Sequence, residues 1–230
     1  MPFGPGPRNS PLTLPHHASV HRLTPPVPAG RPATTGNLQS TFLMSKTTTL
    51  HELLVEELRD LYNAETQLTK ALPKMAKAAT DESLKSGFEE HLDQTHEHIA
   101  RLERAMELLD APAKGKTCKA MKGLIAEGEE KIKEDASPSV RDAALIGAAQ
   151  KVEHYEIAGY GTVRTYAELL GEEEVVSLLQ QTLDEEAETD RKLTQLASSL
   201  NLKAETEGED DEEEDDEDDE EDDVDETDTR

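Results

Sequence analysis

The chain has 230 residues, a formal net charge of −27 and a 33% share of charged residues. This length allows one or two domains, and the acidic balance argues against a nucleic-acid partner, because phosphate contacts need clustered Lys and Arg. The single Cys118 excludes an internal disulfide framework. No apolar run approaches the ~20 residues of a membrane-spanning helix, so we expect no membrane partner and a cytoplasmic protein.

The two ends of the chain differ in composition from its middle. Residues 1–45 are rich in Pro and Gly and predict a disordered extension, while Met44 offers an alternative translation start. Residues 205–230 are almost all Asp and Glu, which repel one another and bury no apolar surface, so this tail is also predicted to be disordered. We expect the acidic tail to bind basic proteins or divalent cations weakly. The folded domain is predicted over residues 46–204.

Helical periodicity runs through almost all of this domain. The first long helix is expected over about residues 48–79, with Pro73 kinking it or ending its regular part. Thr80 or Asp81 can cap the second long helix, which runs to about Leu109.

The second half of the domain begins with a shorter helix over about residues 118–133. Ser137 as N-cap and Pro138 at the first helical position start the third long helix, which ends at Gly171. The last helix is expected over about residues 172–200.

No segment of useful length alternates with period two, so the sequence predicts an all-α protein. Four long helices suffice for a four-helix bundle. The extra short helix lies between the second and third long helices and gives the chain room to cross over, so a simple up-down order is not required.

Polar residues interrupt the apolar stripes near the middle of each long helix. They are Glu65 in the first helix, His91, Asp93 and His96 around the stripe of the second, Glu153 and Glu156 in the third, and Glu186 and Asp190 in the fourth. Unpaired buried carboxylates are very costly, and few Lys or Arg share these stripes. Carboxylates with imidazoles at helical spacing suit iron, manganese or zinc, so the pattern predicts an inner metal site. The alternative is that each Glu is a boundary residue with its carboxylate in water.

Several neighbouring residues have more than one interpretation. His154 or Tyr155 is expected to hold a ligand carboxylate, although a surface position fits His154 equally well. Tyr160 is expected in the core and His98 at the surface. For Cys118, a partly buried structural thiol is a better interpretation than a reactive thiol activated by nearby lysines.

The domain resembles the YciF/YciE family, also called DUF892, of ferritin-like bacterial proteins. The motifs are "DLYNAETQLTKALPKMAKAA", "FEEHLDQTHEHIARLE", "KTCKAMKGLIAEGEE", "VRDAALIGAAQKVEHYEIAGYGT" and "LLQQTLDEEAETDRKLTQLA". The resemblance covers about residues 48–203. It implies a ferritin-like bundle that forms a homodimer, an association with stress, and a rubrerythrin-like two-metal centre, without a settled activity.

Carried over residue by residue, the resemblance assigns a ligand set to this chain. The set is Glu65, an acid-x-x-His pair of Asp93 and His96, a Glu-x-x-Glu pair of Glu153 and Glu156, and Glu186 with Asp190. This departs from the usual ferritin-like pattern, which has Glu-x-x-His on two helices, because the second-helix acid is Asp and the last helix has no His in register. His91 is the alternative imidazole ligand, since it lies nearer the centre of its stripe.

Two functions follow. The first is a stress-associated protein with a carboxylate–histidine dinuclear site, in which iron is expected and manganese or zinc are alternatives, with oxidase or peroxide-scavenging chemistry. The second is a non-enzymatic helical scaffold without metal. Whether the chain is an enzyme stays open at this point.

Overall fold

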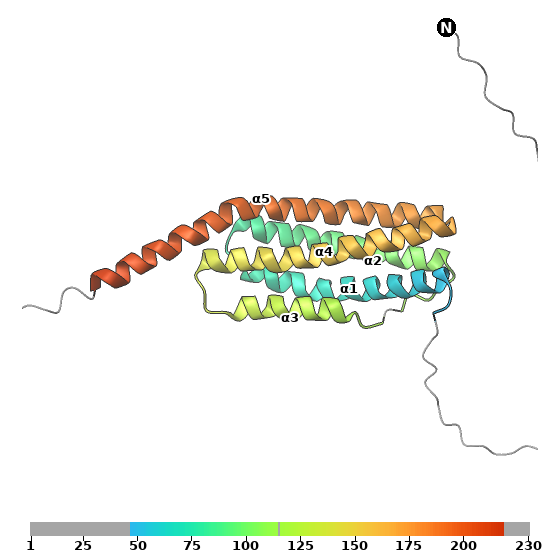
Figure 1. Ribbon diagram of the computed structural model, residues 1–230, viewed down its shortest axis with the longest axis horizontal. Coiled ribbons are helices and arrows are strands. Elements are labelled where there is room, and N and C mark those ends of the chain that lie inside the picture. The colour runs from blue at the N-terminus through green and yellow to red at the C-terminus, as the bar shows by residue number, and fades with distance from the viewer. Residues whose placement is uncertain (1–46, 115, 219–230) are drawn as a thin grey trace, which may run out of the picture. The chain divides into compact units, whose positions relative to one another are not determined.

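The computed structural model describes residues 47–114 and 116–218, with side chains described as far as Thr206. This part of the chain forms five α-helices and no strand. They are α1 (Leu50–Ala78), α2 (Glu82–Leu108), α3 (Lys119–Lys133), α4 (Pro138–Leu170) and α5 (Glu173–Asp218) (Figure 1). The predicted all-α fold is therefore confirmed. The predicted N-terminal extension lies outside the described residues.

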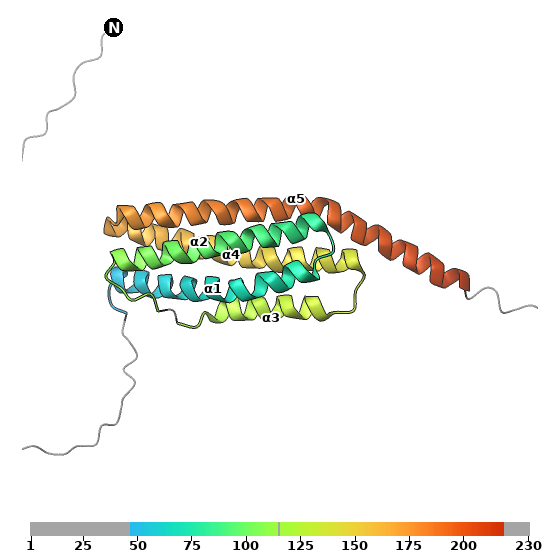
Figure 2. The same ribbon diagram turned by 180° about the vertical axis from the view of Figure 1, so that it is seen from behind.

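The four long helices form a bundle, and α3 lies outside it. Helix α1 packs on α2 and α4, helix α5 packs on α2 and α4, and α3 packs on α1 and α4. The chain leaves α2 at one end of the bundle and enters α4 at the other, and α3 carries it across (Figure 1 and Figure 2). Sequential long helices joined by one long crossover are the ferritin-like arrangement.

The helix ends follow the local signals in the sequence. Thr49 and Glu52 form a capping box at the start of α1, in which the Glu52 amide donates to Thr49 Oγ1 at 3.1 Å. Asp81 caps α2, and Gly171 ends α4 with a left-handed φ of 77°. Ser137 occupies the N-cap position of α4, but its side chain makes no cap hydrogen bond, so Pro138 is the effective start signal.

One helix matches its predicted bounds and one is longer than predicted. Helix α1 continues through Pro73 and ends at Ala78, next to the predicted end at residue 79. Helix α5 runs beyond the predicted end at residue 200 to Asp218, so part of the tail predicted as disordered is helical, and residues 219–230 lie outside the described residues. Elongating an existing helix avoids the cost of nucleation, and no Pro interrupts this stretch.

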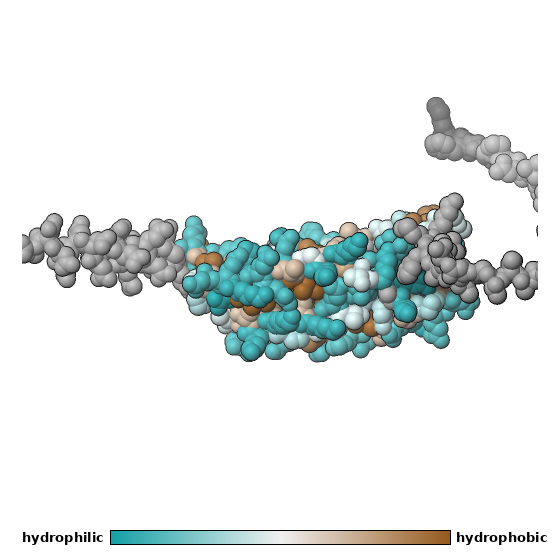
Figure 3. Space-filling model, turned by 90° about the horizontal axis from the view of Figure 1, so that it is seen from below, coloured by the Kyte–Doolittle hydropathy of each residue, from teal (hydrophilic) through white to brown (hydrophobic). Residues whose placement is uncertain are grey.

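The surface gives no sign of a membrane segment. Among the described residues, no helix is long and apolar enough to cross a membrane. The face drawn in Figure 3 is mostly hydrophilic, with small separated hydrophobic areas. The exposed large hydrophobic residues of the described part are Val140, Leu169 and Leu202, which are far apart in sequence.

The apolar core is divided into two clusters along the bundle. On α1, Leu61 belongs to one cluster and Leu68 to the other. On α4, Val152 and Tyr160 are divided in the same way. The α2 and α5 helices repeat this pattern, so each long helix has a gap in its apolar stripe at the same level. Polar side chains fill that level.

Candidate metal centre

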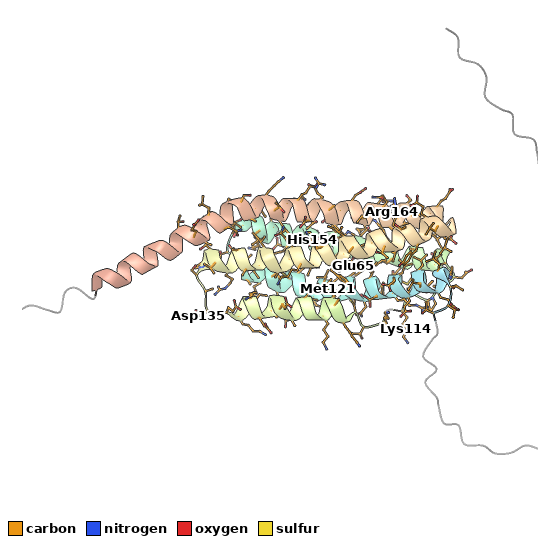
Figure 4. All side chains as sticks on the ribbon, in the orientation of Figure 1. Glu65, Lys114, Met121, Asp135, His154 and Arg164 are labelled. Atoms are coloured by element: carbon orange, nitrogen blue, oxygen red, sulfur yellow. The ribbon has the colours of Figure 1, made fainter. Side chains whose placement is uncertain are left out.

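Six ionisable side chains meet in the level between the two apolar clusters. They are Glu65 of α1, His91 and His98 of α2, Glu153 and Glu156 of α4, and Glu186 of α5. All six, hereafter the carboxylate–histidine cluster, are at most 3% exposed. Figure 4 shows Glu65 inside the bundle, well away from both ends.

The cluster contains two overlapping groups of ligand atoms. In the first, one atom each from His91, Glu153, Glu156 and Glu186 lie within 4.8 Å of one another. The second group consists of Glu65, His98 and Glu186 and meets the same limit. Because Glu186 belongs to both groups, its carboxylate lies between two positions that could each hold a cation.

One nitrogen of each imidazole lies close to two carboxylates of the cluster. His98 Nδ1 lies 3.1 Å from Glu186 Oε1 and 3.4 Å from Glu65 Oε1. His91 Nε2 lies 3.4 Å from Glu153 Oε1 and 3.9 Å from Glu186 Oε2. The two histidines therefore sit at opposite oxygens of Glu186.

Most polar atoms of the cluster lack a hydrogen-bond partner within the described part of the chain, despite these short approaches. The atoms are Glu65 Oε2, His91 Nε2, His98 Nδ1, Glu153 Oε2, and both carboxylate oxygens of Glu156 and of Glu186. Leaving a buried polar atom unpaired costs about 1–3 kcal/mol, and more for a charged group. Oxygen and imidazole nitrogen donors that converge without partners fit a pair of cations such as iron, manganese or zinc.

The far nitrogen of each imidazole is held from outside the cluster. His98 Nε2 lies 2.9 Å from Glu185 Oε2, and the Arg101 guanidinium donates two hydrogen bonds of 2.6 and 2.9 Å to the same carboxylate. His91 Nδ1 has Thr189 Oγ1 and Gln94 Oε1 each at 3.4 Å. These contacts orient the rings so that His98 Nδ1 and His91 Nε2 face the carboxylates.

Tyr160 supports the cluster from α4. Its hydroxyl donates a 2.5 Å hydrogen bond to Glu65 Oε1, and its side chain is fully buried. One oxygen of Glu65 is thus fixed, while Oε2 stays without a hydrogen bond among the described residues. The expected core position of Tyr160 is confirmed, but this hydrogen bond could not be read from the stripe.

Burial and mutual repulsion favour protonated carboxyls in the metal-free cluster. Burial, followed by the charges of neighbouring carboxylates, raises the pKa of Glu153 and of Glu156 well above the usual 4.5. Burial lowers the pKa of His98, but the close carboxylates of Glu186 and Glu65 outweigh this and raise the pKa to about 10. For Glu186, burial raises the pKa, but the neighbouring His98 outweighs it, so that the pKa is lowered. A protonated His98 beside an ionised Glu186 is therefore the favoured metal-free state.

Five of the eight residues proposed from sequence lie in the cluster, namely Glu65, His91, Glu153, Glu156 and Glu186. Asp93 and His96 do not, because both are exposed on the outside of α2. At 100° per residue, these two positions point more than 90° away from His91. The structure thus corrects the expected acid-x-x-His pair, and the alternative ligand His91 faces inward.

His98 is a further correction, since it was expected at the surface and is 0% exposed. His91 and His98 are seven residues apart, which is two helical turns, so both share one face with Phe88, Thr95 and Leu102. Two histidines at this spacing, on the face of an apolar stripe, are a sequence signal that both are buried. Leu92 and Ile99 directly follow the two histidines and fit the apolar period as well, so hydrophobicity alone favours them over the histidines as the inward-facing residues.

Asp190 lies at the edge of the site. Its Oδ1 contacts His154 Nε2 and Gln150 Nε2, each at 3.3 Å, and it is half-buried. Asp190 is among the charges that raise the pKa of Glu153, after burial and the nearer carboxylates. His154 is exposed and reaches this edge residue, so it does not hold a carboxylate of the cluster.

Tyr155 was expected to hold a ligand carboxylate, but it contacts Asp60 and Cys118 instead. Its hydroxyl donates to Asp60 Oδ2 at 2.7 Å and lies 3.0 Å from Cys118 Sγ. Cys118 is the N-cap of α3, is 1% exposed, and has a pKa raised by burial and by its hydrogen bond with Asp60. A structural thiol is therefore the correct interpretation, and this contact fastens the start of α3 to α1 and α4.

The fold and the cluster together define a ferritin-like four-helix bundle with a buried carboxylate–histidine centre. The family described as "Domain of unknown function (DUF892)" matches residues 49–205. The chain belongs to this family.

Relatives with sequence and structural similarity agree with this assignment. Protein YciF of Escherichia coli (strain K12) is 48% identical over 159 residues, which cover 68% of this chain and 96% of that protein. The crystal structure of the E. coli stress protein YciF aligns with a TM-score of 0.66 at 47% identity, covering 68% of this chain and 99% of the other. YcfI, a putative structural protein from Rhodopseudomonas palustris, aligns with a TM-score of 0.65 at 43% identity, covering 66% and 98%.

Proposed function

We propose that this chain is a stress-associated protein that holds two metal ions in the carboxylate–histidine cluster. The observation that carries the proposal is the set of buried ligand atoms on Glu65, His91, His98, Glu153, Glu156 and Glu186 that converge without hydrogen-bond partners among the described residues. Cations are the least costly way to stabilise so many buried carboxylates. The association with stress comes from the E. coli relative, which is described as a stress protein.

The ligand groups suggest how the ions would be shared. His91, Glu153 and Glu156 would hold one ion, Glu65 and His98 would hold the other, and Glu186 would bridge them. Iron is the expected metal and would supply oxidase or peroxide-scavenging chemistry when bound, while manganese and zinc suit the same donors. The chain itself contributes a dry site, fixed imidazole rings and a tyrosine that orients Glu65.

The test is the metal content of protein purified without chelator. We expect about two ions per chain by mass spectrometry of the metals, as a pair of bridged ions requires. We also expect added ferrous iron to raise the melting temperature, because a ligand that binds only the folded state stabilises it. A chain that binds no iron, manganese or zinc, and gains no stability from them, contradicts the proposal.

A non-enzymatic structural role is the second candidate. It is favoured by the description of the R. palustris relative as a putative structural protein. It is also compatible with the His98–Glu186 pair at 3.1 Å, which neutralises one buried carboxylate without metal. The same metal analysis decides between the two roles.

We further propose that the chain forms a homodimer. Sedimentation analysis tests this proposal, and a monomer at micromolar concentration contradicts it.

We also propose that the acidic tail binds divalent cations or basic proteins weakly. Calcium titration of chains with and without residues 205–230 tests this binding. Tail deletion should remove weak calcium binding and leave tight metal binding unchanged.

A further inference from the structure

A groove on the bundle surface runs between α2 and α5. Its volume is about 560 Å³. A smaller cavity of about 30 Å³ adjoins it. Gly87, Glu90, Lys192 and Leu196 line both spaces, so the groove leads into the cavity.

The cavity reaches the carboxylate–histidine cluster. Among its lining residues are His91 and Glu153, which are 3% and 2% exposed, whereas the other four side chains of the cluster are 0% exposed. His91 and Glu153, which are the two members of the cluster with measurable exposure, therefore both line this cavity. Groove and cavity form one path from solvent to the first ligand group.

The size of the cavity limits what can enter it. Its lining combines apolar Phe88, Leu193 and Leu196 with the ionisable side chains of Glu90, Lys192 and Glu153, and Thr189 Oγ1 lies 3.4 Å from His91 Nδ1. About 10–15 Å³ of this kind of space holds one water, so the cavity takes a molecule of one or two heavy atoms. A hydrated ion is larger than this space and would have to lose its water shell at high cost, whereas a small neutral molecule would not.

Gly87 lines both the groove and the cavity. A Cβ added at this position meets no other atom within 4 Å, so a large side chain placed there has open space to occupy. Glycine inside a helix costs about 1 kcal/mol relative to alanine. Lys192 Nζ and Glu90 Oε1, whose residues also line both spaces, form a 2.9 Å ion pair that joins α5 to α2.

We propose that this path admits a neutral molecule of two heavy atoms, with the chemistry of dioxygen or hydrogen peroxide, to the His91–Glu153 side of the cluster. The reason for such a ligand rests on the proposed function. The path itself is a property of the metal-free chain, so it can be tested without metal.

The first experiment uses dissolved dioxygen as a paramagnetic probe of the metal-free protein by nuclear magnetic resonance. We expect faster relaxation at the methyl groups of Leu193, which is 5% exposed, than at those of Leu72 and Leu109, two core leucines that are 4% and 6% exposed and do not line the cavity. Gly87→Leu should remove the excess relaxation. Gly161→Leu is the matched control, because Gly161 is also a half-buried helical glycine with no atom within 4 Å of an added Cβ.

The second experiment measures nitric oxide, a diatomic probe of similar size, binding to the ferrous protein in a stopped-flow spectrometer. Gly87→Leu should slow association about tenfold, the effect of an added barrier of about 1.4 kcal/mol, and Gly161→Leu should not. Leu196→Ala, which widens the cavity, should speed association. Circular dichroism checks that each variant keeps its helical content.

Each outcome decides one statement. Equal relaxation at Leu193, Leu72 and Leu109 in the wild-type protein overturns the path, whether or not metal binds. Excess relaxation at the cavity in a protein that binds no iron, manganese or zinc leaves the path standing and refutes the proposed function. Bound iron with equal nitric oxide rates in wild type and Gly87→Leu overturns the path and leaves the proposed function intact.

Discussion

His98 of α2 and Glu186 of α5 face each other between two adjacent helices, with 3.1 Å between Nδ1 and Oε1. Both side chains are fully buried, and Glu186 belongs to both groups of ligand atoms. In the metal-free protein, the protonated imidazole neutralises the carboxylate. A bound cation would need that same nitrogen unprotonated, so metal and proton compete for one atom.

Glu156 tests the cluster most directly, because both of its oxygens lack a hydrogen bond within the described residues. Glu156→Leu should abolish tight iron binding and leave the helical fold intact. It should also stabilise the metal-free protein by about 1–3 kcal/mol, because it removes a buried carboxyl group whose oxygens have no hydrogen-bond partner. Thermal melts with and without ferrous iron measure both effects. Glu168→Leu, at an exposed position of α4, is the control and should change neither.

Alanine substitutions of His98 and of the nearby His96 should have different effects on metal binding and stability. His98→Ala removes an inward-facing nitrogen and leaves Glu65 and Glu186 without their cationic partner. We expect weaker metal binding and a metal-free protein destabilised by about 3–5 kcal/mol, the usual cost of breaking a buried pair. His96→Ala changes an exposed side chain on the same helix and should alter stability by less than about 0.5 kcal/mol. Equal effects of the two substitutions contradict the assignment of His98.

Bound metal should counteract the pH dependence of stability that the metal-free protein shows. The folded-state pKa values of Glu153, Glu156 and His98 are all raised, so their contributions are lost as pH increases through those values. Glu186 has a lowered pKa, and its contribution is already complete above pH 4.5. The metal-free melting temperature should therefore fall between about pH 6 and about pH 9.

Added manganese(II) should counteract this fall in melting temperature over the same pH range. Its ligands must lose their protons, so the gain in melting temperature on adding metal should grow as pH rises. Parallel melts in chelator and in manganese provide the comparison. A metal-free protein that becomes more stable toward pH 9 would show that the carboxylates ionise without a cation.

Gly159 and Gly161 should respond oppositely to alanine. A Cβ at Gly159 lies 2.8 Å from Leu61 Cδ2, and Leu61 is only 2% exposed, so its side chain has little room to move. Gly159→Ala should lower stability by about 1–3 kcal/mol through overpacking. Gly161→Ala meets open space and should raise stability by about 0.5–1 kcal/mol through helix propensity. Urea unfolding of both variants measures the difference, and a stabilised Gly159→Ala would contradict this close approach of α4 to α1.

The order of the helices could be predicted because each long helix carries its own apolar period and its own end signals. Glu65, Glu153, Glu156 and Glu186 could be predicted as buried because each replaces an apolar residue in a stripe. The α2 histidines were harder, since His91 and His98 each have an apolar neighbour at the next position, and periodicity alone does not separate adjacent residues. The groove between α2 and α5 depends on how two helices pack, and no local pattern encodes it.

The shared carboxylate also ties the centre to the order in which the chain folds. Glu65 is in the first helix and Glu186 in the last, so 121 positions separate two residues that one histidine contacts. During synthesis, the first four helices can associate before α5 emerges, but neither ligand group is complete until α5 docks. Metal capture would then report that the last helix has docked, and a chain cut short before Glu186 would retain most of its helices but neither site.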